Sequence, residues 1–428
     1  MRFAIKTFGC KVNQYESDAI VSAMTESGFE ETALESEAEL FIVNSCTVTE
    51  GSDRKALRAV HRLRRLYPEK IIVLTGCFPQ AFPEEAKASG ADLVTGTGQR
   101  ARLPQLIRQK TNERAAAEAA LLTLPTSFEE LPLPKNKEKT RAFLKIEDGC
   151  DRFCTYCVIP RARGAVRSRS LDSIRAEAER FIREGHREIV LIGINLSRYG
   201  ADCGLTLADA VETVCAVGGT ERVRLSSLEP ELLTEGILSR LAAQEKLCPH
   251  FHLSLQSGCD ETLKRMNRHY TKAEYLALVT RLRVLFPNPA ITTDIMAGFA
   301  GETEEEFAET LAFAEKVGFA KIHAFAYSLR KGTAAERLKD HVPETVKSER
   351  FTRLSALDRR LHRAFLEAQI GTEQQILIQK RSSPEYAAGL TPNYTPVRLY
   401  GSQAARNTIL TVKITGAGED FCFGTQIG

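Results

Sequence analysis

The chain has 428 residues and a formal net charge of +3; 43% of its residues are hydrophobic and 26% are charged. This composition excludes a largely disordered chain, and the length exceeds what one hydrophobic core usually organises. The first residues form too short an apolar run for a signal peptide, and no later run is long enough for a membrane-spanning helix. We therefore expect a cytoplasmic protein of several domains that makes no membrane contact.

The first part of the chain alternates short apolar runs with amphipathic stretches. Strands are expected at 3–7, 40–43 and 71–74, and helices at 16–27 and 54–67. This alternation predicts an α/β domain with an open parallel sheet over residues 1–112. Residues 113–138 are interpreted as a linker, because prolines and a charged run replace the alternating pattern there.

A second alternating region predicts a core over residues 139–368. Its strand runs are separated by helical stretches and lie at 143–147, 188–194, 222–227, 251–255, 290–296 and 321–327. This number of strand–helix units indicates a partial (β/α)6 barrel rather than a complete (β/α)8 barrel. A basic helical run at 342–369 follows. The β-type runs at 375–378, 397–400 and 409–414 predict a small all-β module over residues 369–428.

Cys150, Cys154 and Cys157 have C-x3-C-x2-C spacing just after the first strand of the predicted core. Three thiolates on one loop can hold three irons of a 4Fe–4S cluster and leave the fourth iron open. An open iron can chelate S-adenosylmethionine (SAM), whose reductive cleavage gives a 5′-deoxyadenosyl radical. A zinc site or three unrelated core cysteines are the alternatives, but zinc motifs usually pair two C-x2-C units.

The cysteine spacing, the preceding strand and the partial barrel together resemble the radical SAM superfamily. In that superfamily an aromatic residue stands just before the third cysteine, where Tyr156 stands here. The resemblance implies that Tyr156 packs near the adenine of SAM. Simple shielding of the cluster is the alternative role.

Cys10, Cys46 and Cys77 are far apart in sequence, but each closely follows a predicted strand. The carboxyl ends of parallel strands lie at one edge of a sheet, so the three thiols can converge there. Each could instead be a small buried hydrophobic residue. Spacing alone leaves both interpretations open.

Segments 7–16, 44–49 and 75–77 resemble the amino-terminal domain of the methylthiotransferases, in which three such cysteines bind an auxiliary 4Fe–4S cluster. The resemblance covers nearly the whole chain, including the carboxyl-terminal module, which that family calls TRAM. Closest is the branch that acts on N6-threonylcarbamoyladenosine in tRNA, through residues 9–16, 224–230, 252–260 and 263–268. Ala300 stands where the family usually has proline, which affects only the rigidity of one loop.

The resemblance implies a reaction in two halves with two SAM molecules and two 4Fe–4S clusters. One SAM methylates a sulfur atom at the auxiliary cluster, and the other is cleaved to a radical that abstracts hydrogen from C2 of the adenine. The implied partners are the anticodon stem-loop of tRNA, an electron donor such as a flavodoxin or ferredoxin, and a sulfur source. Isopentenyladenosine or an aspartate of a ribosomal protein is the alternative substrate. A noncatalytic iron–sulfur protein that binds RNA is the alternative from another class.

Polar residues at the ends of later barrel strands are the candidates for SAM contacts, since barrel active sites form at this edge. These candidates are Asn195, Ser226, Glu229 and Gln256. Each could also be a capping or turn residue. Gly298, Gly301 and Thr303 lie in a turn that could wrap around SAM, and Thr303 could also cap the helix that begins at Glu304.

Arg161, Arg163, Arg167 and Arg169 directly follow the cluster loop with no acidic residue among them. Guanidinium groups suit phosphate oxygens, so this run is expected to bind part of the RNA. The basic helix at 54–67 is a second candidate, although charged helix faces are usually only solvated. The five remaining cysteines are interpreted as structural, and His252 as a core or pocket histidine.

Overall fold

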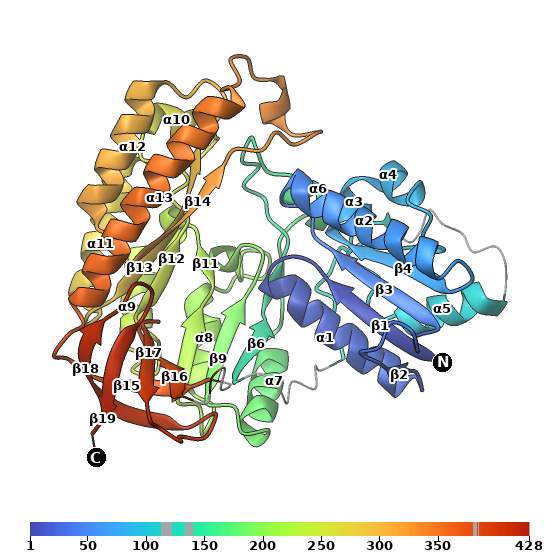
Figure 1. Cartoon of the computed structure of the whole chain (residues 1–428), viewed down its shortest axis with the longest axis horizontal. Helices are drawn as coiled ribbons and strands as arrows, with labels where there is room; N and C mark the ends of the chain where they lie inside the picture. Colours follow the sequence, from blue (N-terminus) through green and yellow to red (C-terminus); the bar gives the residue numbers. More distant parts are fainter. Residues whose placement is uncertain (113–121, 133–139, 380–382, 384, 428) are drawn as a thin grey trace.

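The protein is described by a computed structural model covering residues 1–112, 122–132, 140–379, 383 and 385–427. Figure 1 shows a blue N-terminal α/β domain beside a central barrel in green, yellow and orange, with a red C-terminal barrel against one end of the central barrel. Most of the linker predicted at 113–138 lies outside the described residues. Its described part, 122–132, packs on the protein, since Leu131 is buried in a cluster with Val12 and Phe143.

The N-terminal domain is built on a parallel sheet with the strand order β2-β1-β3-β4-β5. Alternate residues of the fully buried β3 enter two different hydrophobic clusters, one with α2 and one with α1 and α5, so helices cover both faces. The strands are β1 (Arg2–Thr7), β2 (Glu30–Glu31), β3 (Leu40–Ser45), β4 (Ile71–Gly76) and β5 (Leu93–Val94). The helices are α1 (Lys11–Glu26), α2 (Glu50–Leu66), α3 (Cys77–Ala81), α4 (Pro83–Lys87) and α5 (Leu103–Asn112). The predicted parallel α/β domain is thus confirmed.

Helix α1 begins at Lys11, five residues before the predicted start at 16. Its first turn reads as polar, but Val12 and Tyr15 are buried against the central barrel. The pattern of one domain alone does not reveal that contact. The earlier start places the first turn of α1 directly after Cys10.

The central barrel consists of parallel strands in two sheets, β10-β9-β6 and β11-β12-β13-β14, which confirms the predicted partial barrel. Its strands are β6 (Arg141–Lys145), β9 (Glu188–Ile192), β10 (Arg222–Leu225), β11 (Ser227–Leu228), β12 (His250–Leu253), β13 (Ala290–Ala297) and β14 (Lys321–Ala326), and β7 (Glu147–Asp148) pairs separately with β8 (Arg167–Ser168). Its helices are α6 (Ile159–Arg163), α7 (Leu171–Arg183), α8 (Leu207–Cys215), α9 (Glu235–Ala242), α10 (Asp260–Arg265), α11 (Lys272–Leu285), α12 (Glu304–Val317) and α13 (Glu344–Glu367), with short 3-10 turns η2 (Leu196–Arg198), η3 (Pro230–Leu232) and η4 (Ala334–Arg337).

The strand expected at 222–227 is split at Ser226 into β10 and β11, and this break separates the two sheets. The Ser226 backbone N–H still donates to the Leu191 carbonyl oxygen at 3.0 Å. Its buried side-chain Oγ, however, has no hydrogen-bond partner among the described residues. A free hydroxyl group is therefore available at the break.

The C-terminal module is a closed barrel with the strand order β15-β16-β17-β19-β18, as the all-β prediction required. Its strands are β15 (Glu373–Ile378), β16 (Tyr386–Leu390), β17 (Pro396–Tyr400), β18 (Ile409–Ala417) and β19 (Cys422–Gln426); the predicted runs did not include β16 and β19. Arg222 donates to the Leu390 and Gln375 carbonyl oxygens, each at 3.0 Å, which attaches the module to β10. The domain boundaries at 112, 138 and 368 stay predictions. Among the described helices, none is long and apolar enough to cross a membrane.

Candidate active site

Cys10, Cys46 and Cys77 lie together at one edge of the N-terminal sheet. Strand β3 pairs in parallel with both β1 and β4, so the chain leaves the three strands at the same level. The Oδ1 of Asn13 lies 3.5 Å from Cys10 Sγ and 4.0 Å from Cys77 Sγ. The expected convergence of the thiols is therefore present, while their role as cluster ligands stays a prediction.

Gly9 allows the close approach of Cys10 to Cys46. Its φ of +122° is a conformation that residues with a side chain rarely adopt. A Cβ atom at this position would lie 2.7 Å from Cys46 Cβ and 3.2 Å from Cys46 Sγ. Any larger residue would therefore push these two cysteines apart.

The Arg163 guanidinium group lies beside the thiol of Cys77, with Arg163 Nε 3.2 Å from Cys77 Sγ. Burial raises the pKa of Cys46 and raises the pKa of Cys77 to about 12, and Arg163 opposes both shifts. Iron binds the thiolate form of cysteine. Arg163 therefore favours the form of Cys77 that a metal cluster requires.

Arg163 also belongs to a buried network of charges between the N-terminal domain and the central barrel. Its Nη2 lies 2.9 Å from Glu16 Oε2, and its Nη1 lies 3.2 Å from Asp148 Oδ2. Lys145 joins the same two carboxylates at 2.8 and 2.7 Å, and Arg100 lies 3.0 Å from Glu16. Burial alone would raise the pKa of Glu16, but the three cations outweigh it and lower the pKa to about 2. The network therefore keeps Glu16 ionised.

Cys150, Cys154 and Cys157 lie on one loop between β7 and α6. The Cys157 N–H donates to the Cys154 carbonyl oxygen at 2.9 Å, and the Cys150 N–H donates to the Gly164 carbonyl oxygen at 3.0 Å. Gly149 makes this second contact possible, because its φ is +96° and a Cβ atom would overlap the Ala165 carbonyl group. Since Gly164 directly follows Arg163, one short segment connects the two sets of cysteines.

Polar side chains from two other connections of the barrel contact the sulfur atoms of this loop, Asn195 after β9 and Arg268 between α10 and α11. Asn195 Nδ2 lies 3.5 Å from Cys150 Sγ, and Arg268 Nη1 lies 3.2 Å from Cys154 Sγ. Burial raises the pKa of the Cys150 thiol to about 11, and hydrogen bonding from Asn195 is among the contacts that lower it. Donors to sulfur stabilise thiolates and tune iron–sulfur clusters. These residues therefore fit a 4Fe–4S cluster.

Of the predicted SAM-binding residues, Asn195 and Glu229 lie beside this loop, whereas Ser226 lines a cavity inside the barrel; contacts of all three with SAM stay predictions. Asn195 is buried and its Oδ1 has no hydrogen-bond partner among the described residues, as is true of Ser226 Oγ. Glu229 is paired with Arg268, the residue that contacts Cys154. Asn195 Oδ1 and Ser226 Oγ are buried without a hydrogen-bond partner among the described residues, and atoms of this kind are suited to bind a ligand.

Gln256 and Tyr156 occupy two other parts of the same region. Gln256 has a φ of +66°, while its backbone still bridges Asp294 and Met296 at 2.8 and 2.9 Å. A residue other than glycine in this conformation is strained, and such residues gather at functional sites. Tyr156 packs edge-on against Phe299, with 6.2 Å between the ring centroids.

The turn that contains Gly298, Gly301 and Thr303 packs against α13. The Gly298 N–H donates to Glu302 Oε2 at 2.7 Å, and the same carboxylate pairs with Arg350 of α13 at 2.8 Å. Thr303 forms a capping box at the start of α12, which confirms the predicted helix cap. Contact of this turn with SAM stays a prediction.

The structure corrects the prediction that the whole arginine run binds RNA. Arg163, Arg167 and Arg169 are each at most 3% exposed and pair with buried carboxylates, Arg169 with that of Glu177. They are therefore unavailable to a phosphate backbone. Arg161 alone of the four is exposed, and its guanidinium group lies 5.2 Å from the ring centroid of Phe82.

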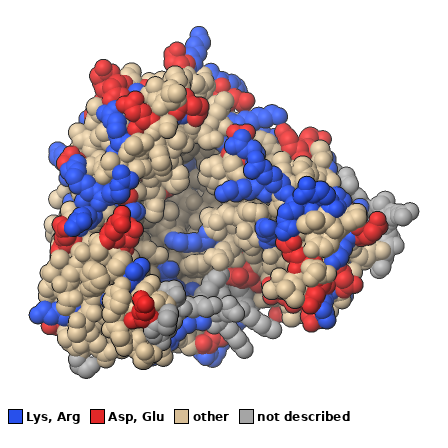
Figure 2. Space-filling view, in the orientation of Figure 1, with Lys and Arg blue, Asp and Glu red and all other residues tan. Residues whose placement is uncertain are grey.

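A basic surface remains available on the N-terminal domain. Figure 2 shows Lys and Arg gathered over α2 and α6, beside a hollow between this domain and the central barrel. Exposed members on α2 include Lys55, Arg58 and Arg65. The second candidate for RNA binding thus retains exposed charges.

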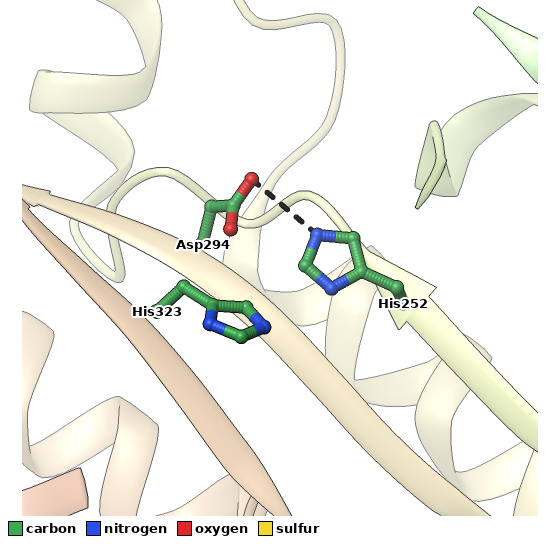
Figure 3. Close-up of side chains that lie close together, drawn as sticks. All are labelled: His252, Asp294 and His323. Carbon is green, nitrogen blue, oxygen red and sulfur yellow. Dashed lines mark ion pairs between the residues drawn. The ribbon is translucent and has the colours of Figure 1, made fainter. Parts of the chain in front are cut away.

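His252, Asp294 and His323 form a group that was not predicted from the sequence. Their ligand atoms lie within 4.8 Å of one another, with His252 Nε2 3.3 Å from Asp294 Oδ2 (Figure 3). His252 is buried and its Nδ1 lies 3.0 Å from Thr292 Oγ1, as expected for a pocket histidine. The sequence does contain a pattern that predicts this group. Polar residues recur at every second position of β12, β13 and β14, and side chains with this period point to the same face of a strand, here into the barrel.

Comparison with known proteins agrees with this architecture. The sequence model of the Radical SAM superfamily matches residues 144–314, and that of "Uncharacterized protein family UPF0004" matches residues 2–96. TsrM of Kitasatospora setae, a radical S-adenosylmethionine methyltransferase solved with cobalamin and a [4Fe-4S] cluster, superposes with a TM-score of 0.59. The two chains are 14% identical over 90% of this chain and 80% of that one, so this likeness concerns the fold alone.

Two relatives show how far the likeness extends in sequence. The threonylcarbamoyladenosine tRNA methylthiotransferase MtaB of Bacillus subtilis is 36% identical over 97% of this chain and 94% of its own length. The tRNA-2-methylthio-N(6)-dimethylallyladenosine synthase of Oceanobacillus iheyensis is 34% identical over 97% of this chain and 82% of its own length.

The fold and the three-cysteine loop thus define a radical SAM enzyme, for which a 4Fe–4S cluster and SAM are the implied cofactors. With its additional N-terminal domain, the chain belongs to the family of radical SAM methylthiotransferases, and it is a transferase.

Proposed function

We propose that this enzyme adds a methylthio group to C2 of N6-threonylcarbamoyladenosine next to the anticodon of tRNA. The proposal includes two SAM molecules and two 4Fe–4S clusters, with Cys150, Cys154 and Cys157 holding one cluster and Cys10, Cys46 and Cys77 the other. The observation that carries it is that one short segment contacts both sets of cysteines. Arg163 contacts the sulfur of Cys77, and the carbonyl oxygen of the next residue, Gly164, accepts from the Cys150 N–H. The MtaB relatives support the choice of substrate.

Two thiol sets suit the replacement of an aromatic C–H bond by a C–S bond. An aromatic C–H is too weakly acidic for a general base, and a reduced cluster with SAM supplies a radical that can abstract such a hydrogen. The chain has to hold the base between the two sets and exclude water from it. The charged network around Glu16 and Arg163 supports this role, because it fixes the N-terminal domain against the barrel.

Nucleoside mass spectrometry tests the substrate assignment. Reconstituted protein is incubated anaerobically with SAM, sulfide and a flavodoxin or ferredoxin as electron donor. Anticodon stem-loops carrying a threonylcarbamoyl or an isopentenyl group are compared, together with ribosomes, whose proteins are analysed by peptide mass spectrometry. A methylthio adduct on the threonylcarbamoyl nucleoside is the expected result. Modification only of the isopentenyl nucleoside or of the ribosome would overturn the proposed substrate.

Cysteine variants test the roles of the two thiol sets. Cys157→Ala should abolish 5′-deoxyadenosine formation and keep the iron of the auxiliary cluster. Cys77→Ala should keep 5′-deoxyadenosine formation and lose methylthio transfer. Cys203→Ala is the matched control, because this cysteine is exposed and lies outside both sets. Formation of 5′-deoxyadenosine by Cys157→Ala would contradict the assignment.

A noncatalytic iron–sulfur protein that binds RNA predicts a different spectrum. A site with an open iron should change its electron paramagnetic resonance spectrum when SAM is added to the reduced protein. No change with SAM, together with no 5′-deoxyadenosine, would favour the noncatalytic alternative.

The basic surface on α2 is the proposed contact for the anticodon stem-loop. Each phosphate contact adds to the salt dependence of binding, so Lys55→Glu with Arg58→Glu should weaken binding and reduce the salt slope by about 2. Arg183→Glu on α7 is the control, since this arginine is also exposed. Equal binding by both variants would contradict this placement of the RNA.

A further inference from the structure

A cavity of about 430 Å³ opens inside the barrel where the three structural units meet. Lys11 contributes from the N-terminal domain and Tyr394 from the C-terminal barrel, while Arg224, His252, Asp294 and His323 line it from the central strands. We call it the lumen cavity. This volume falls within the range of about 300–1,000 Å³ that is usual for pockets that bind small molecules.

The charges around the lumen cavity favour an anion. Arg224 is balanced by Glu188 at 2.7 Å, and a second lining cation, Lys321, is balanced by Asp358 at 2.8 Å. For the Lys11 ammonium group, in contrast, neither an ion pair nor a hydrogen bond is found within the described ranges. A cation without a counter-ion at the wall of a cavity is a ready partner for a carboxylate.

The remaining polar groups of the cavity can form directional hydrogen bonds. His252 Nε2 is buried and has no hydrogen-bond partner among the described residues, although Asp294 lies 3.3 Å away. Figure 3 shows Asp294 and the two imidazole rings of His252 and His323 facing one another from neighbouring strands. Together they present both acceptors and donors to a hydroxyl or amide group.

The same three side chains could be regarded as a site for a divalent metal ion. The Lys11 ammonium group argues against that, because it lines the same cavity without a counter-ion among the described residues and would repel a second positive charge, whereas Arg224 and Lys321 are balanced by Glu188 and Asp358. The ligand that fits Lys11 and Asp294 together is therefore an anion that also carries hydrogen-bond donors.

The position of Lys11 connects the cavity with the chemistry. Lys11 directly follows Cys10 and begins α1. On adenine, C2 and C6 flank N1, so a substituent on N6 projects from the same edge as the reacting carbon. If C2 is presented to a cluster held by Cys10, that substituent would lie near Lys11, the next residue in the chain.

We propose that the lumen cavity is the specificity pocket for the N6 substituent and that Lys11 binds its carboxylate. The inference rests on the proposed function. A threonylcarbamoyl group carries a carboxylate, a hydroxyl and two N–H groups, whereas a dimethylallyl group is a hydrocarbon that would leave Lys11, His252 and Asp294 without partners. A polar pocket left unpaired in this way discriminates strongly between two substrates.

Lys11→Met tests the proposal, since it removes the charge and keeps most of the length of the side chain. The variant should lower kcat/KM for a threonylcarbamoyl stem-loop by about 10- to 100-fold, as expected for a lost bond to a charged group. Iron content and SAM cleavage without RNA should be unchanged, and Lys11→Arg should retain part of the activity. Lys87→Met, at an exposed lysine of α4, is the matched control.

The outcomes separate this inference from the proposed function. If wild-type protein modifies the threonylcarbamoyl substrate and Lys11→Met does so equally well, the pocket assignment is wrong and the function stands. If wild-type protein modifies only the dimethylallyl substrate, the proposed function itself fails. A zinc ion bound stoichiometrically by wild type and Lys11→Met, but lost in His252→Ala, would identify a metal site instead and overturn the inference.

Discussion

Replacing Arg163 by methionine removes the cation that joins the two cysteine-bearing regions. Arg163 and Glu16 are fully buried and Asp148 nearly so, and the substitution leaves both carboxylates with fewer counter-ions. Breaking a buried pair by removing one partner costs about 3–5 kcal/mol. The lowering of the pKa of Glu16 from 4.5 to about 2 corresponds to roughly 3 kcal/mol net, after the opposing effect of burial. We therefore expect a loss of about 3 kcal/mol.

Differential scanning calorimetry of the cluster-free protein measures this loss. For a unit of 150–250 residues, about 3 kcal/mol lowers the unfolding temperature by roughly 6–12 °C. Arg183→Met is the matched control, because Arg183 is 69% exposed and its ion pair with Glu179 spans 3.8 Å; such pairs contribute at most about 1 kcal/mol. If both variants unfold at the same temperature, the buried network does not hold the two regions together.

Three further predictions follow from single residues. Burial raises the pKa of Glu147 from 4.5 to about 8, so the folded protein loses about 5 kcal/mol of stability as the pH rises from 4.5 towards 8. Relative to wild type, Glu147→Gln should unfold at a temperature higher by roughly 10–20 °C at pH 9 but not at pH 4, measured by calorimetry. Gly9→Ala should lower the auxiliary iron content of the reconstituted protein, whereas Gly236→Ala, which has open space around it, should not. Arg268→Met should slow 5′-deoxyadenosine formation about 10- to 100-fold, because it removes a donor to the Cys154 sulfur; an unchanged rate would contradict that role.

The sequence allowed prediction of those features that depend on local pattern. The convergence of Cys10, Cys46 and Cys77 followed from strand ends in a parallel sheet, and the Thr303 cap followed from a residue type just before a helix. The burial of Arg163 could not be predicted in this way. Its partner Glu16 is 147 residues distant in the chain, so a run of arginines without nearby acids looks like a free basic surface.

The lumen cavity shows the same limit more clearly, because its walls come from all three units. Lys11 and Tyr394 are 383 positions apart in the chain, and nothing in either local segment indicates that they face one cavity. The polar residues of β12, β13 and β14 do leave a trace, since they recur at every second position, with Thr293 as the one further polar residue of β13. That trace predicts an interior polar surface but not which charge remains unpaired.

The buried network around Arg163 is better explained by placement than by stability. A buried ion pair is often no more stabilising than well-packed apolar residues of the same volume, because desolvation offsets the attraction. Its directional bonds nevertheless penalise any rotation of the N-terminal domain that separates Glu16 from Arg163. Arg163 also contacts Cys77 and directly precedes the carbonyl group that holds Cys150. A shift large enough to misplace one cysteine set against the other would therefore expose or unpair buried charges, which gives the relative position of the two sets a steep energetic cost.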